Sequence, residues 1–244
     1  MGIPVGLAFH TEKLHDDPVW HRVEAVARWM ASRGIGATFF VYPFRALIAE
    51  RDIGDRVRVL AALGHEIGQH THFYAGTKDA KHEKADDLSE ANIVWCLKRD
   101  FETLQRFGCR PSGFTAGGWF ANDVVLDTLV TLGFVYDCSA RFPRSTGVVN
   151  TPYRRWLRKP QQYASAAGDL LRLPTTCSLG EWFKWGRNVR VDGVVPYQLI
   201  CLHDYDLLSS RFLAPWHILA RAKGKCFVPV GMLAKELRKV ESHV

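Results

Sequence analysis

The sequence predicts an α/β protein whose single domain, residues 1–244, folds as a distorted (β/α)7-type barrel. Short apolar runs of strand length alternate with amphipathic stretches of helix length, which is typical of a parallel sheet. About seven or eight such units are enough to close, or nearly close, a barrel. The length of 244 residues and the 47% hydrophobic content suit one sizeable core. Neither a GxGxxG nor a GxxxxGK[ST] loop is present, which argues against the nucleotide folds built on them.

The expected strands are apolar runs rich in β-branched and aromatic residues, bounded by turn residues. In chain order they span residues 5–9, 37–42, 66–72, 112–116, 134–136, 170–175, 197–202 and 226–230.

The expected helices begin at capping residues and end near glycine. Asp17 precedes Pro18 at the start of the first helix, and Gly34 ends it. Ser89 and Asn122 cap two later helices. The helices span residues 18–33, 44–63 with a break near Gly54, 90–107, 123–132, 212–222 and 232–240.

Three stretches lack a regular pattern. Residues 75–87 are polar and read as a solvated loop, and residues 140–168 read as an irregular excursion over the barrel mouth. A second excursion contains Trp182. Tryptophans there could stack on a sugar face or fill the core.

Charge and cysteine content limit the partners and the compartment. The net charge of +7 is dispersed, which suits an anionic substrate such as a sugar diphosphate, or peripheral contact with a membrane. No basic stripe interleaved with aromatics predicts nucleic-acid binding. The six cysteines form no CxxC pair, no apolar run reaches roughly 18 residues, and the N-terminus lacks a basic leader. We therefore expect a cytoplasmic protein with reduced thiols.

Polar residues follow five of the expected strands, at the ends that carry the active site in a β/α barrel. They are His10, Glu12, His70, His72, Thr115, Asp137, His203 and Asp204. His70 and His72 lie two apart, so an extended backbone puts both on one face. Imidazole is a common zinc ligand, although an isolated HxH pair can equally cap a strand.

Five motifs resemble those of the polysaccharide deacetylases, the NodB-homology fold of carbohydrate esterase family 4. They are ATFFV at 37–41, GHEIGQHT at 64–71, Arg110-Pro111 with Gly113, GFVYD at 133–137 and LHD at 202–204. The resemblance covers roughly residues 3 to 232, and it is greatest to a WbmS-like subgroup associated with lipopolysaccharide O-antigen clusters.

The resemblance implies a metal-dependent hydrolase that removes an N-acyl group from an amino sugar. A divalent ion, usually zinc, would polarise the acyl group and activate water. His70 matches the first metal histidine, His203 the histidine that protonates the leaving amine, and Arg110 the arginine that orients a carboxylate. The candidate substrate-binding residues are Thr115, Trp119, Asp137 and Tyr74.

The chain departs from the family pattern at two positions. Where the family has a first aspartate, this chain has His10, with Glu12 at the place of the metal carboxylate. Where the family has its second histidine, this chain has Tyr74. His72 could replace the lost ligand while His10 acts as the base.

Alternatively, His10 could join His70 and His72 on the metal, leaving Glu12 as the base. Asp204 is a further base candidate, or a residue that orients His203.

The leading functional hypothesis is removal of an acetyl or formyl group from an amino sugar in surface-polysaccharide (O-antigen-type) biosynthesis. The sugar would be linked to a nucleotide or to a polyprenyl phosphate. Two alternatives stay open. The chain could hydrolyse a non-sugar amide, or it could be a non-catalytic glycan-binding protein with a degraded metal site.

Overall fold

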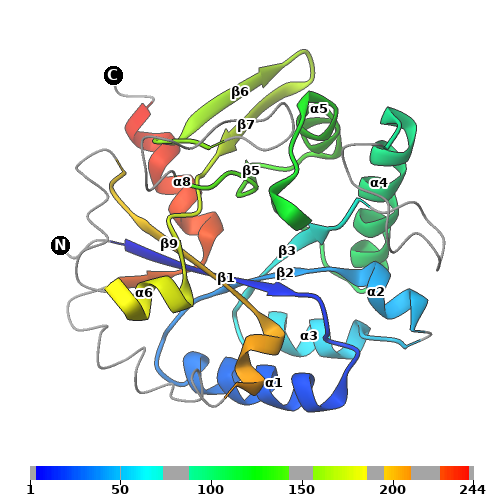
Figure 1. Cartoon of the computed structure of the whole chain (residues 1–244), viewed down its shortest axis with the longest axis vertical. Coiled ribbons are helices and arrows are strands. Elements are labelled where there is room, and N and C mark those ends of the chain that lie inside the picture. Colours follow the sequence, from blue (N-terminus) through cyan, green and yellow to red (C-terminus); the bar gives the residue numbers. More distant parts are fainter. Residues whose placement is uncertain are drawn as a thin grey trace.

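The computed structural model describes residues 4–49, 51–73, 88–142, 156–185, 195–209 and 226–241. Its centre is a ten-stranded sheet that curls into a half-barrel, with helices packed around the outside (Figure 1). The predicted α/β barrel-type fold is therefore confirmed, although among the described residues no pairing joins the terminal strands β6 and β8.

The strands follow the order β6-β7-β5-β4-β3-β2-β1-β9-β8, with β10 paired to β1. Every pairing is parallel except that of β6 with β7. The strands are β1 Pro4–Thr11, β2 Thr38–Val41, β3 Glu66–Thr71, β4 Gly113–Ala116, β5 Tyr136–Asp137, β6 Gln161–Ser165, β7 Gly168–Arg172, β8 Cys177–Ser178, β9 Gln198–His203 and β10 Cys226–Val228.

The helices begin and end largely where the sequence predicts. The Ser89 and Asn122 side chains accept the backbone N–H of the residue three positions on, and Gly133 ends α5 in the left-handed region at φ 83°. The helices are α1 Asp17–Ala31, α2 Pro43–Ile48, α3 Gly54–Ala62, α4 Glu90–Arg106, α5 Asp123–Leu132, α6 Leu179–Trp185 and α8 Val230–Glu241, with 3-10 turns η2 Gly117–Trp119 and η3 Asp204–Leu208. In the described part of the chain, no helix is long and apolar enough to cross a membrane. The helix expected at 212–222 lies outside that part.

Two expected irregular stretches contain regular structure. Strand β6 forms an antiparallel hairpin with β7 inside the 140–168 stretch. It was missed because its residues are mostly exposed and polar, so no apolar alternation marks it. The second excursion contains β8 and α6, and Trp182 is fully buried, which makes it a core residue and not a sugar platform.

Strand β1 lies at the centre of the fold and separates two layers of side chains. Val5, Leu7 and Phe9 pack in the outer core with helix α1, whereas Ala8 belongs to the core inside the curl. Because side chains alternate along a strand, His10 faces the same inner side as Ala8. The inner face at the carboxyl ends of the strands is therefore where the polar residues gather.

The amino end of the sheet is tied to the last helix. Glu66 Oε2 accepts hydrogen bonds from Thr38 Oγ1 at 2.6 Å and from the backbone N of Gly231 at 2.8 Å. Thr38 Oγ1 in turn accepts the backbone N–H of Val230 at 2.8 Å. These bonds satisfy the first amides of α8 and fix that helix against β2 and β3.

Candidate metal centre

Strand β3 presents His70 to the inner face because its neighbours are held on the outer face. Gln69 Nε2 donates to the carbonyl of Leu97 at 3.0 Å, and Thr71 Oγ1 donates to Asp100 Oδ2 at 2.9 Å, both on α4. Alternation then directs His70 inward, and His72 follows on the same side just beyond the strand.

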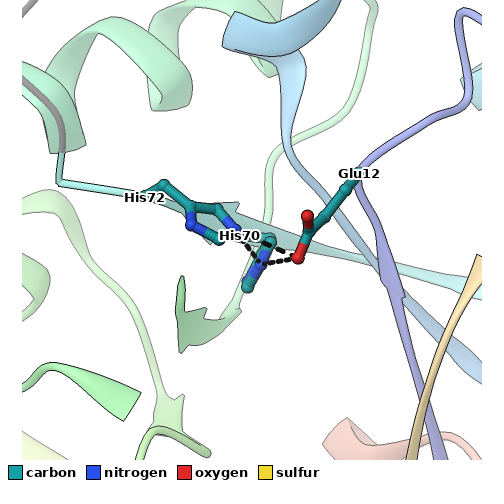
Figure 2. Close-up of side chains that lie close together, drawn as sticks. All are labelled: Glu12, His70 and His72. Atoms are coloured by element: carbon teal, nitrogen blue, oxygen red, sulfur yellow. Dashed lines mark hydrogen bonds and ion pairs between the residues drawn. The ribbon is translucent and has the colours of Figure 1, made fainter. Parts of the chain in front are cut away.

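Glu12 completes a group of three metal-ligand side chains. Its Oε1 lies 3.4 Å from His70 Nε2 and 3.0 Å from His72 Nε2, and the two Nε2 atoms are 3.1 Å apart. Figure 2 shows the carboxylate reaching from the end of β1 toward the two imidazoles. All three ligand atoms lie within 4.8 Å of one another, so one ion could contact all of them.

The donor set suits a divalent metal. The Nδ1 of His70 lies 2.9 Å from the carbonyl oxygen of Thr115, so Nδ1 can donate to that oxygen and Nε2 is the nitrogen that would bind an ion in place of its proton. Burial lowers the pKa of His70. Burial alone would raise the pKa of Glu12, but hydrogen bonds with His70 and His72 hold it far below its usual range. One carboxylate and two imidazoles form the ligand chemistry of many zinc sites.

His10 lies beside this group but outside it. Its ring centroid is 5.0 Å from that of His70 and 5.3 Å from that of His203. Burial, followed by the charges of His70 and His203, lowers its pKa well below the usual value. Its Nε2 is buried without a hydrogen-bond partner among the described residues. His10 is therefore a neutral imidazole with one nitrogen available to a ligand or a proton.

His203 sits next to His10 in the β1–β9 register and has the opposite protonation tendency. Its Nε2 lies 3.7 Å from Glu12 Oε1 and its Nδ1 3.7 Å from Asp206 Oδ2. Burial acts to lower the pKa of His203, but Asp206 and Glu12 outweigh it and the pKa is raised. Sequence reasoning missed Asp206, although a carboxylate three residues after a histidine could have been considered as its partner.

Asp204 holds backbone in place and does not fit the predicted role of a base. Its Oδ2 accepts the N–H of Lys13 at 2.7 Å and its Oδ1 the N–H of Tyr205 at 2.9 Å. The residue is fully buried, and burial raises its pKa to about 6. With both oxygens occupied, Asp204 joins the carboxyl ends of β1 and β9.

Comparison with known proteins places this geometry on a known scaffold. No family model and no curated protein matches the chain. A putative polysaccharide deacetylase from Mycobacterium smegmatis superposes with a TM-score of 0.69 at 18% identity, over 99% of this chain and 92% of that one. The chain has the fold of the polysaccharide deacetylases.

Two further structures share the deacetylase fold. A family 4 carbohydrate esterase from Streptomyces lividans, solved with acetate, matches with a TM-score of 0.56 at 15% identity, over 92% of this chain and 91% of that one. A CE4 family pseudoenzyme from Bacillus anthracis matches with a TM-score of 0.56 at 13% identity, over 96% of this chain and 66% of that one. The scaffold therefore includes proteins described as enzymes and one described as a pseudoenzyme.

Two predicted site residues do not reach the inner face of this deacetylase fold. Asp137 is fully buried, accepts the N–H of Ser139 at 2.8 Å, and pairs with Arg172 Nε at 3.3 Å. Since Tyr136 occupies the inner core, alternation turns Asp137 to the outer side. Arg110 is exposed and precedes β4, at the strand's amino end. The arginine that pairs with Asp137 is Arg172, which has no motif around it in the sequence.

Thr115 and Trp119 do lie at the site. The Thr115 carbonyl holds His70, and its Oγ1 is buried without a hydrogen-bond partner in the described ranges. The Trp119 ring lies 5.7 Å from that of His10 and forms a wall beside it. Trp119 has φ 62°, a conformation that is uncommon without glycine and often found at functional sites. Tyr74 lies outside the described residues.

Proposed function

We propose that the chain is a metal-dependent hydrolase that removes an acetyl or formyl group from the nitrogen of an amino sugar. The observation that supports this most directly is the convergence of Glu12, His70 and His72 at the carboxyl edge of a deacetylase fold. These residues would hold the ion, most simply zinc. When bound, it would supply Lewis acidity to the acyl carbonyl and to the attacking water.

The two remaining histidines suit the two proton transfers of amide hydrolysis. His10, with its pKa lowered and a lone pair available, would accept the proton of the attacking water. His203, with its pKa raised beside Asp206, would donate a proton to the leaving amine. Environments that separate the pKa values of neighbouring groups are the usual basis of acid and base assignment.

The geometry favours one of the two ligand sets that the sequence leaves open. His10 is not a member of the group of three whose ligand atoms converge, whereas His72 is. We therefore propose that His72 replaces the histidine absent at position 74, and that His10 stays off the metal. The resemblance of the motifs extends this proposal to surface-polysaccharide biosynthesis of the O-antigen type.

The first test measures metal content and amine release together. We expect about one divalent ion per chain in the wild type, lost in His70→Ala and retained in His10→Ala with turnover reduced at least 100-fold. The exposed His21→Ala, on α1, is the matched control and should change neither quantity. Full metal retention by His70→Ala would overturn the proposed centre.

A non-catalytic function is the second candidate. A pseudoenzyme shares this fold, and this chain also departs from the family at its first motif. In that case the protein would bind N-acyl amino sugars, and no variant or metal would produce free amine. If the protein instead hydrolysed small non-sugar amides and no N-acyl amino sugar, its substrate would be a non-sugar amide.

A further inference from the structure

Lys13 and Tyr205 are brought together by one buried carboxylate beside the metal centre. Asp204 accepts the backbone N–H of Lys13 through Oδ2 at 2.7 Å and that of Tyr205 through Oδ1 at 2.9 Å. Lys13 directly follows the proposed ligand Glu12, and Tyr205 lies two residues after His203. The positions of both backbones are therefore fixed relative to the proposed reacting groups.

The side chains of this pair contact each other, and one of them contacts His203. The Lys13 ammonium lies over the Tyr205 ring, 5.2 Å from its centroid. The Tyr205 ring stacks on the imidazole of His203, with centroids 4.8 Å apart and planes inclined by 15°. A cation over an aromatic face is held in position but keeps its full charge.

The ammonium of Lys13 has no carboxylate partner of its own among the described residues. Within the described part of the chain, Lys13 Nζ makes no ion pair, whereas nearby Arg51 and Arg56 both pair with Asp17. The pKa of half-buried His15 is lowered, first by burial and then by Arg45, against the opposing charge of Asp16, with Lys13 as the smallest contributor. The Lys13 ammonium is therefore available to an anionic ligand, at an edge that also carries the carboxylates of Glu12, Asp204 and Asp206.

We propose that Lys13, positioned by Tyr205 and Asp204, forms a subsite for an anionic group on the substrate. The inference rests on the proposed hydrolase function and specifies its substrate class as an N-acyl amino sugar that carries a phosphate or a carboxylate. A cation held over the ring that stacks on His203 favours a substrate that carries a negative charge close to its N-acyl sugar.

Direct binding to the full chain tests the subsite without needing turnover. The probes are N-acetylglucosamine, its 1-phosphate and an N-acetylhexosaminuronic acid, measured by calorimetry. We expect Lys13→Met to weaken binding of an anionic probe about tenfold and to leave the neutral sugar unchanged. Lys13→Arg should restore charge-dependent binding, which excludes a folding defect. If Lys13→Met weakens binding of the 1-phosphate, the subsite binds a phosphate. If it weakens binding of the uronic acid, the subsite binds a carboxylate.

Lys235→Met is the matched control, because Lys235 is exposed on α8, which begins at the opposite end of the sheet. Equal affinity of wild type and Lys13→Met for both anionic probes would overturn the subsite, as would the same loss for the neutral sugar. Charge-selective binding by a protein that releases no amine would overturn the proposed hydrolase and leave the subsite standing.

Discussion

The position of His72 depends on a residue that has no side chain. The imidazole of His72 packs directly against Gly117, where any Cβ would overlap its Nδ1 and Cγ. The sequence allows His72 to be named as a replacement ligand, but it cannot show that a glycine more than forty residues later makes room for the ring. That information exists only in the folded chain.

Gly117→Ala should displace the His72 ring and weaken metal binding at least tenfold, because a ligand misplaced by a few tenths of an ångström loses much of its bond. Competition with a chromophoric chelator would measure this. Gly64→Ala is a suitable control. Gly64 has φ 84° with open space around it, so alanine there should cost about 1 kcal/mol of stability and leave metal affinity intact. Unchanged affinity in Gly117→Ala would show that the ring is not confined.

Strand β3 and helix α4 are joined by a buried polar network behind the metal centre. Asp100 accepts Thr71 Oγ1 at 2.9 Å and pairs with Arg99 Nη2 at 2.8 Å, while Gln69 bonds both Thr71 and the backbone of α4. Thr71 lies between the two histidines, so this network holds the segment that presents them. Its members were not predicted, because Asp100 lies at an interior position of a helix whose partner strand is not evident from the sequence.

The network should make stability depend on pH. Burial raises the pKa of Asp100 from its ordinary 3.8 to about 6, despite Arg99. The folded state therefore keeps a proton that the unfolded chain loses, so stability falls as pH rises from about 4 to about 6 and then levels off. This increase in the pKa of Asp100 corresponds to a loss of about 3 kcal/mol in the free energy of unfolding across that pH range.

Asp100→Asn should remove this dependence. Urea unfolding should give a free energy of unfolding for the variant that increases relative to that of the wild type as pH rises across this range. All other groups titrate in both proteins, so their contributions cancel in the difference. The exposed Asp55→Asn should show no such shift. A difference that is independent of pH would contradict the prediction.

At the scale of the whole molecule, Glu66 connects the sheet to the C-terminal helix. Glu66→Ala removes the acceptor for Thr38 and for the first turn of α8, and should lower the free energy of unfolding by about 3 kcal/mol. Metal content should not change, because Glu66 lies at the amino end of β3, away from the ligands. Glu236→Ala on the exposed face of α8 should cost less than about 0.5 kcal/mol. Equal losses of unfolding free energy in the two variants would show that the hydrogen bonds of Glu66 do not stabilise the contact between the sheet and α8.

The sequence predicts the repeating layers better than their edges. Strands with apolar runs, such as β1 and β3, appear close to their predicted bounds, because burial on both faces leaves a clear signal. Strand β6 and helix α6 were missed, since one is polar and the other lies in an aromatic stretch without helical periodicity.

The site divides in the same way. Glu12, His70, His10 and His203 follow strand ends and were found from that position alone. Arg172 acts through a partner whose proximity is set by tertiary structure, so its position in the sequence gives no sign of it, whereas Asp206 is signalled only by its spacing of three residues from His203. Arg110 and Asp137 lie away from the inner face, which the motif resemblance could not indicate because it does not say which way a side chain points.

The pairing of β1 has a consequence for biosynthesis. This strand is synthesised before the other strands of the sheet, yet its partners β9 and β10 begin at residues 198 and 226. At ordinary rates of translation the wait is about 10 to 40 s. During that time one apolar edge of β1 has no native neighbour. Nascent chains would therefore be most prone to aggregate before β9 and β10 are made, and the ligand carboxylate at residue 12 reaches its final position only after those strands have paired with β1.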